Sequence, residues 1–278
     1  MTRWLFAAVP VARVAWLRTV LYLFVVVDVL LTTPWVAAHR DVPTGLYQPL
    51  LVGRLLHLPT PTHTGVIAVE VGVLVASLVA ATGRLPRVAG ITVALLYLEW
   101  MVIANSYGKV DHDRFAFLVA LAVLPTAGRA RHDDQTASEA AGWAVRAIQL
   151  SVVATYFFSA WAKLRFGGLG WVNSAVLTRA VLRRGTPLAD PLLHHAWVLQ
   201  LSQWGIMAFE LASPIVLWLR GRWVYVAVGF FLAFHVVTFA AITISFLPHV
   251  MCLLAFLPLE RIRIPVRARL LRAAPASA

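Results

Sequence analysis

The apolar segment at residues 147–164 ends in a lysine, Lys163, within an otherwise uncharged run. Residues three, four and seven positions apart lie on one side of a helix. The polar side chains of this segment have that spacing and are expected to form one stripe: Gln149, Tyr156, Ser159 and Lys163. Arg146 extends the stripe by one turn. Because an ionisable side chain in a membrane span faces a protein interior, a partner or a watery cavity, this combination of hydrogen-bonding groups and one amine predicts the functional site.

Other apolar segments also carry ionisable side chains: Arg18, Asp28, Glu70, Glu99, Glu210 and His235. Each unpaired charge in a membrane costs roughly 2.5–3.5 kcal/mol on insertion scales. So many together predict mutual pairing around an interior polar site. The alternative is that they only hold helices together, as buried polar contacts commonly do.

Composition assigns the chain to the membrane proteins. Hydrophobic residues make up 60% of the 278 residues, charged residues 13%, and the mean hydropathy is +0.79, whereas soluble domains are about half apolar and a quarter charged. The net charge of +12 does not indicate a nucleic-acid partner, because the basic residues are scattered between apolar runs, where they set membrane orientation. The single cysteine, Cys252, excludes an intramolecular disulfide and a cysteine-built metal site. No metal site is expected from the scattered histidines either.

The chain is expected to form one domain, residues 1–278, of the all-α integral membrane class. It would be a bundle of about seven to eight transmembrane helices with a short amphipathic helix in the membrane interface. Arginines in alternate loops favour a cytoplasmic N-terminus. The expected spans are 14–38, 64–82, 88–107, 114–127, 142–164, 194–219 and 223–246, with a shorter segment at 247–259.

Two further segments are expected at the membrane surface. The connection at 165–193 contains WVNSAVLTRAVLRRG, which predicts a short amphipathic helix with its arginines toward water or headgroups. This helix would either anchor the protein or form a lid over a cavity. The basic tail at 259–278 predicts an anchor to anionic membrane lipid.

Three sequence blocks resemble a known family. TYFFSAWAKL with Trp171 shortly after it, FELASPIVLWL at 209–219 and FHVVTFAAITISFLPHVM at 234–251 follow one another in the family order. They are similar to the vitamin K-dependent gamma-carboxylases and, more broadly, to the bacterial HTTM (horizontally transferred transmembrane) domain group that contains them. The best-matched part is 142–258, and the resemblance implies a bacterial cell membrane protein.

The resemblance implies specific roles for several residues. In the carboxylases the motif lysine deprotonates a reduced naphthoquinone, vitamin K hydroquinone, so Lys163 would be the base and His235 a polar contact in the same cavity. The substrate, a lipophilic quinol, would be bound by Gln149, Tyr156, Ser159, Trp171 and Glu210. A lysine accepts a proton only as the neutral amine, which apolar surroundings favour and a carboxylate close by opposes.

Departures from the family pattern keep other functions open. Only a short basic tail follows the last apolar segment, so the expected enzyme is a quinol-oxidising one without the peptide-binding extramembrane portion of the carboxylases. One alternative is a non-catalytic subunit or immunity-like component of an exported system, with a membrane protein partner. The other is a small proton-coupled transporter in which Glu99, Glu210 and His235 relay protons.

Overall fold

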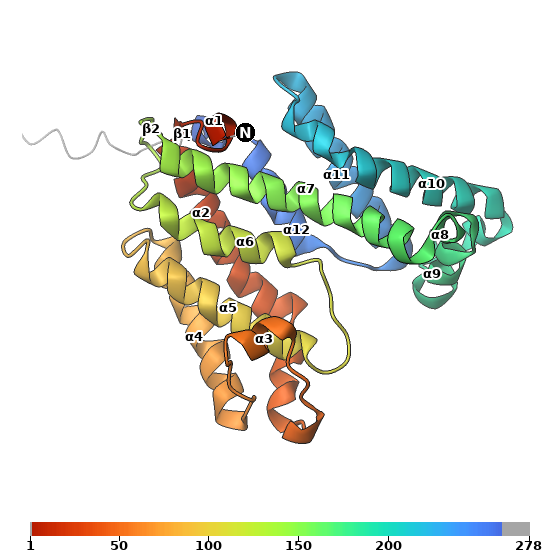
Figure 1. Ribbon diagram of the computed structural model, residues 1–278, viewed down its shortest axis with the longest axis horizontal. Coiled ribbons are helices and arrows are strands. Elements are labelled where there is room, and N and C mark those ends of the chain that lie inside the picture. Colours follow the sequence, from red (N-terminus) through yellow and green to blue (C-terminus); the bar gives the residue numbers. More distant parts are fainter. Residues whose placement is uncertain (1, 263–278) are drawn as a thin grey trace, which may run out of the picture.

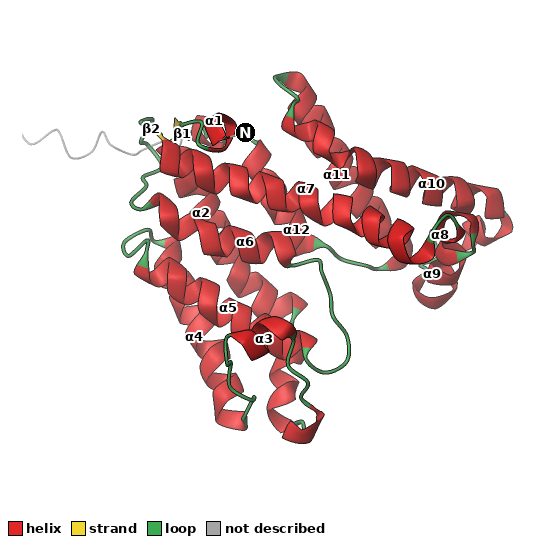
Figure 2. Ribbon diagram, in the orientation of Figure 1, coloured by secondary structure: helices red, strands yellow, loops and turns green. Residues whose placement is uncertain are grey.

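The computed structural model of the protein describes residues 2–262, and about 75% of it is helical. Most of the basic tail predicted at 259–278 lies outside the described residues. Figure 2 shows helices throughout, joined by loops of different lengths. The long helices are α2 (Val11–Val27), α4 (His63–Ala81), α5 (Val88–Asn105), α7 (Glu139–Gly167), α10 (Ala196–Ala212) and α11 (Arg222–Ile242).

Shorter elements connect and cover these helices. The α-helical ones are α1 (Thr2–Leu5), α3 (Leu51–Leu55), α6 (Phe115–Val123), α8 (Gly170–Asn173), α9 (Val176–Arg184) and α12 (Leu247–Cys252). A π-helical turn, Asp28–Thr32, extends α2, and 3-10 turns extend three helices: Leu124–Ala127 after α6, Ser213–Leu217 after α10 and Leu253–Phe256 after α12. Further 3-10 turns lie at Pro34–Asp41, Thr44–Leu46, Asp190–His194 and Leu259–Arg261. The two-residue strands β1 (Val9–Pro10) and β2 (Ala137–Ser138) pair antiparallel and join the N-terminal segment to the start of α7.

Five helices are long and apolar enough to cross a membrane: Val11–Thr32, His63–Ala81, Val88–Asn105, Glu139–Gly167 and Arg222–Ile242. Phe115–Ala127 and Leu247–Phe256 form shorter apolar helices. Large apolar side chains such as Val236 and Phe239 of α11 are exposed along these helices, as expected of surfaces that face lipid. The protein is therefore an integral membrane protein, and the expected total of seven to eight spans stays a prediction.

Two of the expected spans end earlier than predicted. The first helix stops at Thr32 instead of residue 38, since the residue before a proline avoids the α conformation and Thr33 precedes Pro34. The span expected to reach residue 246 ends at Ile242, where Thr243 adopts a left-handed conformation with φ 56°. The extended stretch that follows turns the chain back and lets α12 begin at Leu247.

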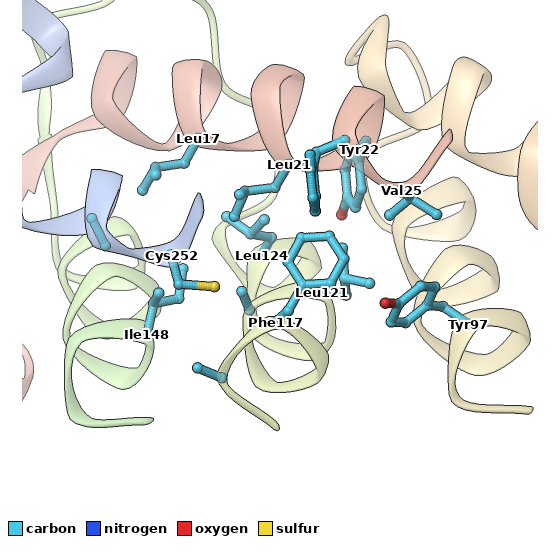
Figure 3. Packing of buried hydrophobic residues seen from close by; sticks show 14 of the residues in the cluster. Leu17, Leu21, Tyr22, Val25, Tyr97, Phe117, Leu121, Leu124, Ile148 and Cys252 are labelled. Atoms are coloured by element: carbon cyan, nitrogen blue, oxygen red, sulfur yellow. The ribbon is translucent and has the colours of Figure 1, made fainter. Parts of the chain in front are cut away.

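The helices pack in two parts on either side of α7 (Figure 1). On one side α2, α4 and α5 pack together, and α6 connects them to α7. On the other side α7 packs on α10, and α8 and α9 cover the end of this pair. Figure 3 shows the main core, where Leu21 and Tyr22 of α2 meet Phe117 of α6 and Tyr97 of α5. This rigid core holds α7 in place, and α7 carries the stripe of polar residues.

Candidate functional site

The polar stripe of α7 meets α10 at an ion pair. The Nζ atom of Lys163 lies 2.7 Å from Oε1 and 2.5 Å from Oε2 of Glu210. Ser159, one turn before Lys163, donates a hydrogen bond to Glu210 Oε1 at 3.4 Å. The ammonium group also lies 4.8 Å from the centre of the Trp171 ring in α8, a cation–π geometry. The structure thus brings together four of the residues that the sequence singled out.

A second polar pair lies about two helical turns before Lys163 in α7. The Tyr156 hydroxyl is 2.6 Å from Nε2 of His235 in α11. The Tyr156 ring stacks on Phe231 at 4.9 Å and meets the edge of His249 at 4.6 Å. Nδ1 of His235 and both ring nitrogens of His249 are buried without a hydrogen-bond partner among the described residues. Buried polar atoms normally have partners, so these nitrogens are available to a bound molecule.

Both polar pairs line one cavity of about 610 Å³. That volume is within the range of small-molecule sites, about 300–1,000 Å³. α7 contributes Lys163, Ser159 and Tyr156, and α10 and α11 contribute Glu210 and His235. The other side chains from α9 and α11 are mostly apolar, among them Val181, Phe234 and Val237. A cavity with this lining suits a largely apolar molecule that carries one or two polar groups.

Helix α9 covers this cavity. Val176, Leu177 and Val181 line it, whereas Arg179 and Arg183 are exposed. A helix is therefore present where the sequence predicted an amphipathic one, and it forms one wall of the cavity. Whether it also lies in the membrane interface stays a prediction.

Gln203 of α10 fixes the connection that leads into α9. Its side-chain nitrogen donates to the carbonyl oxygens of Trp171, Val172 and Ser174, at 3.2, 2.9 and 2.8 Å. Its side-chain oxygen accepts a hydrogen bond from the backbone N–H of Leu177 at 2.8 Å. A single buried amide thus positions both the tryptophan beside Lys163 and the first turn of α9.

Gln149 lies in the same stripe but does not line the cavity. Its oxygen accepts a hydrogen bond from Arg146 at 2.7 Å, and its nitrogen donates to the carbonyl oxygen of Ala255 at 2.8 Å. Arg146 in turn lies over the Trp4 ring. The predicted substrate-binding residue Gln149 is therefore in a packing contact between α7 and the turn after α12, about two helical turns from Tyr156.

The other ionisable residues lie outside this cavity. Asp28 pairs with Arg114 at 3.1 Å and accepts a hydrogen bond from Tyr97 at 2.7 Å. Glu99 and Glu70 do not line the cavity either. Among the acidic side chains that the structure describes, Glu210 alone pairs with Lys163. Asp28 thus has the structural role that was the alternative for these residues.

Sequence reasoning missed His249 and His112 as residues of the site. Both line the cavity, and His249 is 1% exposed. His249 lies in the third family block, directly after Pro248, which was the one available signal. Within residues 2–262 no group of three or more His, Cys, Asp or Glu side chains could hold a metal ion.

The fold and this site define a class of protein, an integral membrane helix bundle that encloses a lipophilic cavity with paired ionisable groups. The family model of the HTTM domain matches residues 6–260. Because this match covers nearly the whole chain, the protein belongs to the HTTM domain family. No curated protein and no solved structure matches the chain significantly.

Proposed function

We propose that the protein is a gamma-carboxylase-like enzyme that oxidises a lipophilic quinol, such as a reduced naphthoquinone, in the cavity beneath α9. The observation that carries this proposal is the Lys163–Glu210 pair at the wall of a mainly apolar cavity. The apolar walls suit the ring and its hydrocarbon chain, and the polar groups of α7 suit the two hydroxyl groups.

The ion pair provides a route for the first proton. A charged pair in an apolar cavity loses much of its solvation, which favours transfer of the Lys163 proton to Glu210 and leaves a neutral amine beside a neutral carboxylic acid. The amine then takes the proton of a quinol hydroxyl as a general base. Glu210 therefore assists Lys163 by accepting its proton, whereas a carboxylate that stayed ionised would hold the proton on the amine and oppose the base role.

Tyr156 and the two histidines orient the substrate in this proposal. The unpartnered ring nitrogens of His235 and His249 are free to bond the second oxygen of the quinol, and the stack of Tyr156 on Phe231 gives the ring a flat neighbour. The oxidant is molecular oxygen. One of its atoms enters the ring as an epoxide and the other leaves as water.

The proposed topology places this site toward one membrane face. We propose that α6, α10 and α12 also cross the membrane with their 3-10 extensions, for a total of about seven to eight spans. In this topology α9 lies in the interface, the N-terminus is cytoplasmic and the membrane is bacterial. The exposed arginines of α9 and its apolar cavity face support the interfacial position.

Quinol turnover by the purified protein tests the proposal. The protein in nanodiscs receives reduced naphthoquinone, oxygen and bicarbonate, and mass spectrometry follows the epoxide. Wild type is compared with Lys163→Ala and with Lys109→Ala, which removes an exposed lysine that pairs with Asp111. We expect epoxide from wild type and Lys109→Ala only. A folded wild type that forms no epoxide would refute the enzyme proposal and favour a non-catalytic membrane subunit.

A further inference from the structure

A second and larger cavity lies at the other end of α7. It has a volume of about 1190 Å³ and lies where the start of α2, the α4–α5 connection, the α6–α7 connection and residues 260–262 come together. In Figure 1 these connections lie near β2, far from α8 and α9. None of its lining residues belongs to the site beneath α9.

The basic side chains of this cavity outnumber its acidic ones. It is lined by four arginines and two acidic residues: Arg18, Arg84, Arg131, Arg261, Asp133 and Glu260. Both acidic residues already have partners, since Asp133 pairs with Arg131 and Glu260 with Arg13. Arg18, Arg84 and Arg261 have no acidic partner among the described residues. The cavity thus has excess positive charge.

Arg18 is the buried member of this group. The residue is 1% exposed, and its Nη2 atom donates to the carbonyl oxygens of Leu124 and Gly128, at 3.3 and 2.7 Å. Its Nε and Nη1 atoms have no hydrogen-bond partner among the described residues. A buried charge without a counter-charge is costly, and a guanidinium group matches the geometry of phosphate oxygens.

Further polar groups lie beside Arg18. Thr19 is on the next position of α2, and its hydroxyl lies 3.0 Å from Nε2 of His132. Trp16 meets the ring of His132 edge-on at 4.6 Å, so the imidazole is held in place. Thr19 and His132 both line the cavity, and the Thr19 hydroxyl also lies 3.4 Å from the carbonyl oxygen of Ala81. Because the two side chains bond each other, one of them at a time can donate a hydrogen bond to an anion held by Arg18.

We infer that this cavity binds a phosphate group, with Arg18 at its base and Arg84 and Arg261 at its exposed side. The group belongs either to the headgroup of an anionic lipid or to a free phosphate, since both present the same oxygens. The inference does not depend on the function proposed for the cavity beneath α9.

Binding to the purified full-length protein in detergent tests the inference. The probes are inorganic phosphate, dioctanoyl phosphatidylglycerol and dioctanoylglycerol, which lacks the phosphate. Equilibrium binding and native mass spectrometry give the affinity and the number bound. We expect saturable binding of one phosphate-bearing probe per protein and none of dioctanoylglycerol. Binding of the lipid alone identifies a headgroup site, and binding of inorganic phosphate identifies a site for the free ion.

Three substitutions distinguish a specific phosphate site from an effect of overall surface charge. Arg84→Gln removes an exposed arginine of the cavity, and we expect it to weaken binding about tenfold, as loss of a charge-assisted hydrogen bond does. Arg129→Gln is the matched control, because it removes an arginine that lines only the adjacent smaller cavity. Arg18→Lys retains the charge and loses the planar fork, with an expected loss larger than that of Arg84→Gln.

The inference is overturned if neither phosphate-bearing probe binds saturably. It is also overturned if Arg84→Gln and Arg129→Gln weaken binding equally, since the effect would then come from overall charge. If Arg18→Lys does not fold, the comparison of the two exposed arginines still decides the question.

Discussion

Removing Lys163 alone should destabilise the protein, and removing its partner as well should restore stability. In the folded protein the side chains of Lys163 and Glu210 are 21% and 7% exposed. Lys163→Met leaves a buried carboxylate that, among the described residues, keeps only the 3.4 Å hydrogen bond from Ser159. Breaking a buried ion pair costs about 3–5 kcal/mol, and we expect about 3 kcal/mol because the lysine end is partly exposed.

The two other variants complete a double-mutant cycle. Glu210→Met leaves an ammonium that still contacts the Trp171 ring and can extend toward water, so its cost should be smaller, about 1–2 kcal/mol. The double variant Lys163→Met/Glu210→Met replaces the pair with apolar groups, a change that is often neutral or stabilising. If the double variant is as stable as wild type, the coupling energy between the two positions equals the sum of the two single losses, about 4–5 kcal/mol.

Unfolding and turnover must be measured on the same preparations. Thermal unfolding in detergent, followed by tryptophan fluorescence, gives the stability of each variant. We expect the double variant to regain the stability of wild type and to form no epoxide, which separates the packing of the pair from its chemistry. Additive losses of stability would refute the buried ion pair. Full turnover by a stable double variant would refute the proton route.

Three further predictions concern packing, acid stability and the second polar pair. Gly142→Ala in α7 should destabilise the protein by about 1–3 kcal/mol, since the added carbon would collide with the carbonyl oxygen of Ala7. In the control Gly205→Ala in α10 the added carbon contacts no other atom, and this variant should be more stable than wild type by about 0.5–1 kcal/mol. Thermal unfolding compares the two variants. Burial alone would raise the pKa of the Glu260 carboxyl, but hydrogen bonds from Arg13 hold this pKa below its ordinary value. The pair therefore stabilises the fold fully above pH about 4.3, and this stabilisation is lost as the pH falls through the lowered pKa. Arg13→Gln should flatten this acid dependence in unfolding curves recorded from pH 6 downward, roughly to pH 3, and an unchanged curve would contradict it. Tyr156→Phe removes the 2.6 Å contact between the tyrosine hydroxyl and His235, so it should reduce epoxide formation about tenfold or more while the protein still folds. Full activity of this variant would exclude a role for that contact.

The sequence predicted the membrane class and most helix positions because both depend on local properties. A run of apolar residues long enough to cross a bilayer is visible in any window of the chain, and the observed helices α4, α5 and α7 begin and end within a few residues of the expected spans. The joint position of Lys163, Ser159 and Tyr156 was predictable for the same reason, since helical spacing alone places them on one side of α7.

The rest of the site depends on how distant segments pack. Gln149 has the same helical spacing as Tyr156, yet the turn after α12 covers it. No periodicity indicates which neighbour a helix face meets. His249 reaches the cavity because the chain turns back after Thr243, and a left-handed residue that is not glycine gives no clear sequence signal.

The two cavities also bear on the orientation of the protein in the membrane. Helix α7 has 29 residues, so it is about 43 Å long. Its first residues lie near the arginine-rich cavity, and Lys163 lies near its last turn. Arginines are retained on the cytoplasmic side, so the proposed orientation places the Lys163–Glu210 pair near the opposite face. In the proposed reaction both hydrogens of the quinol end in the water formed from oxygen in this cavity, so turnover near that face moves no net proton across the membrane.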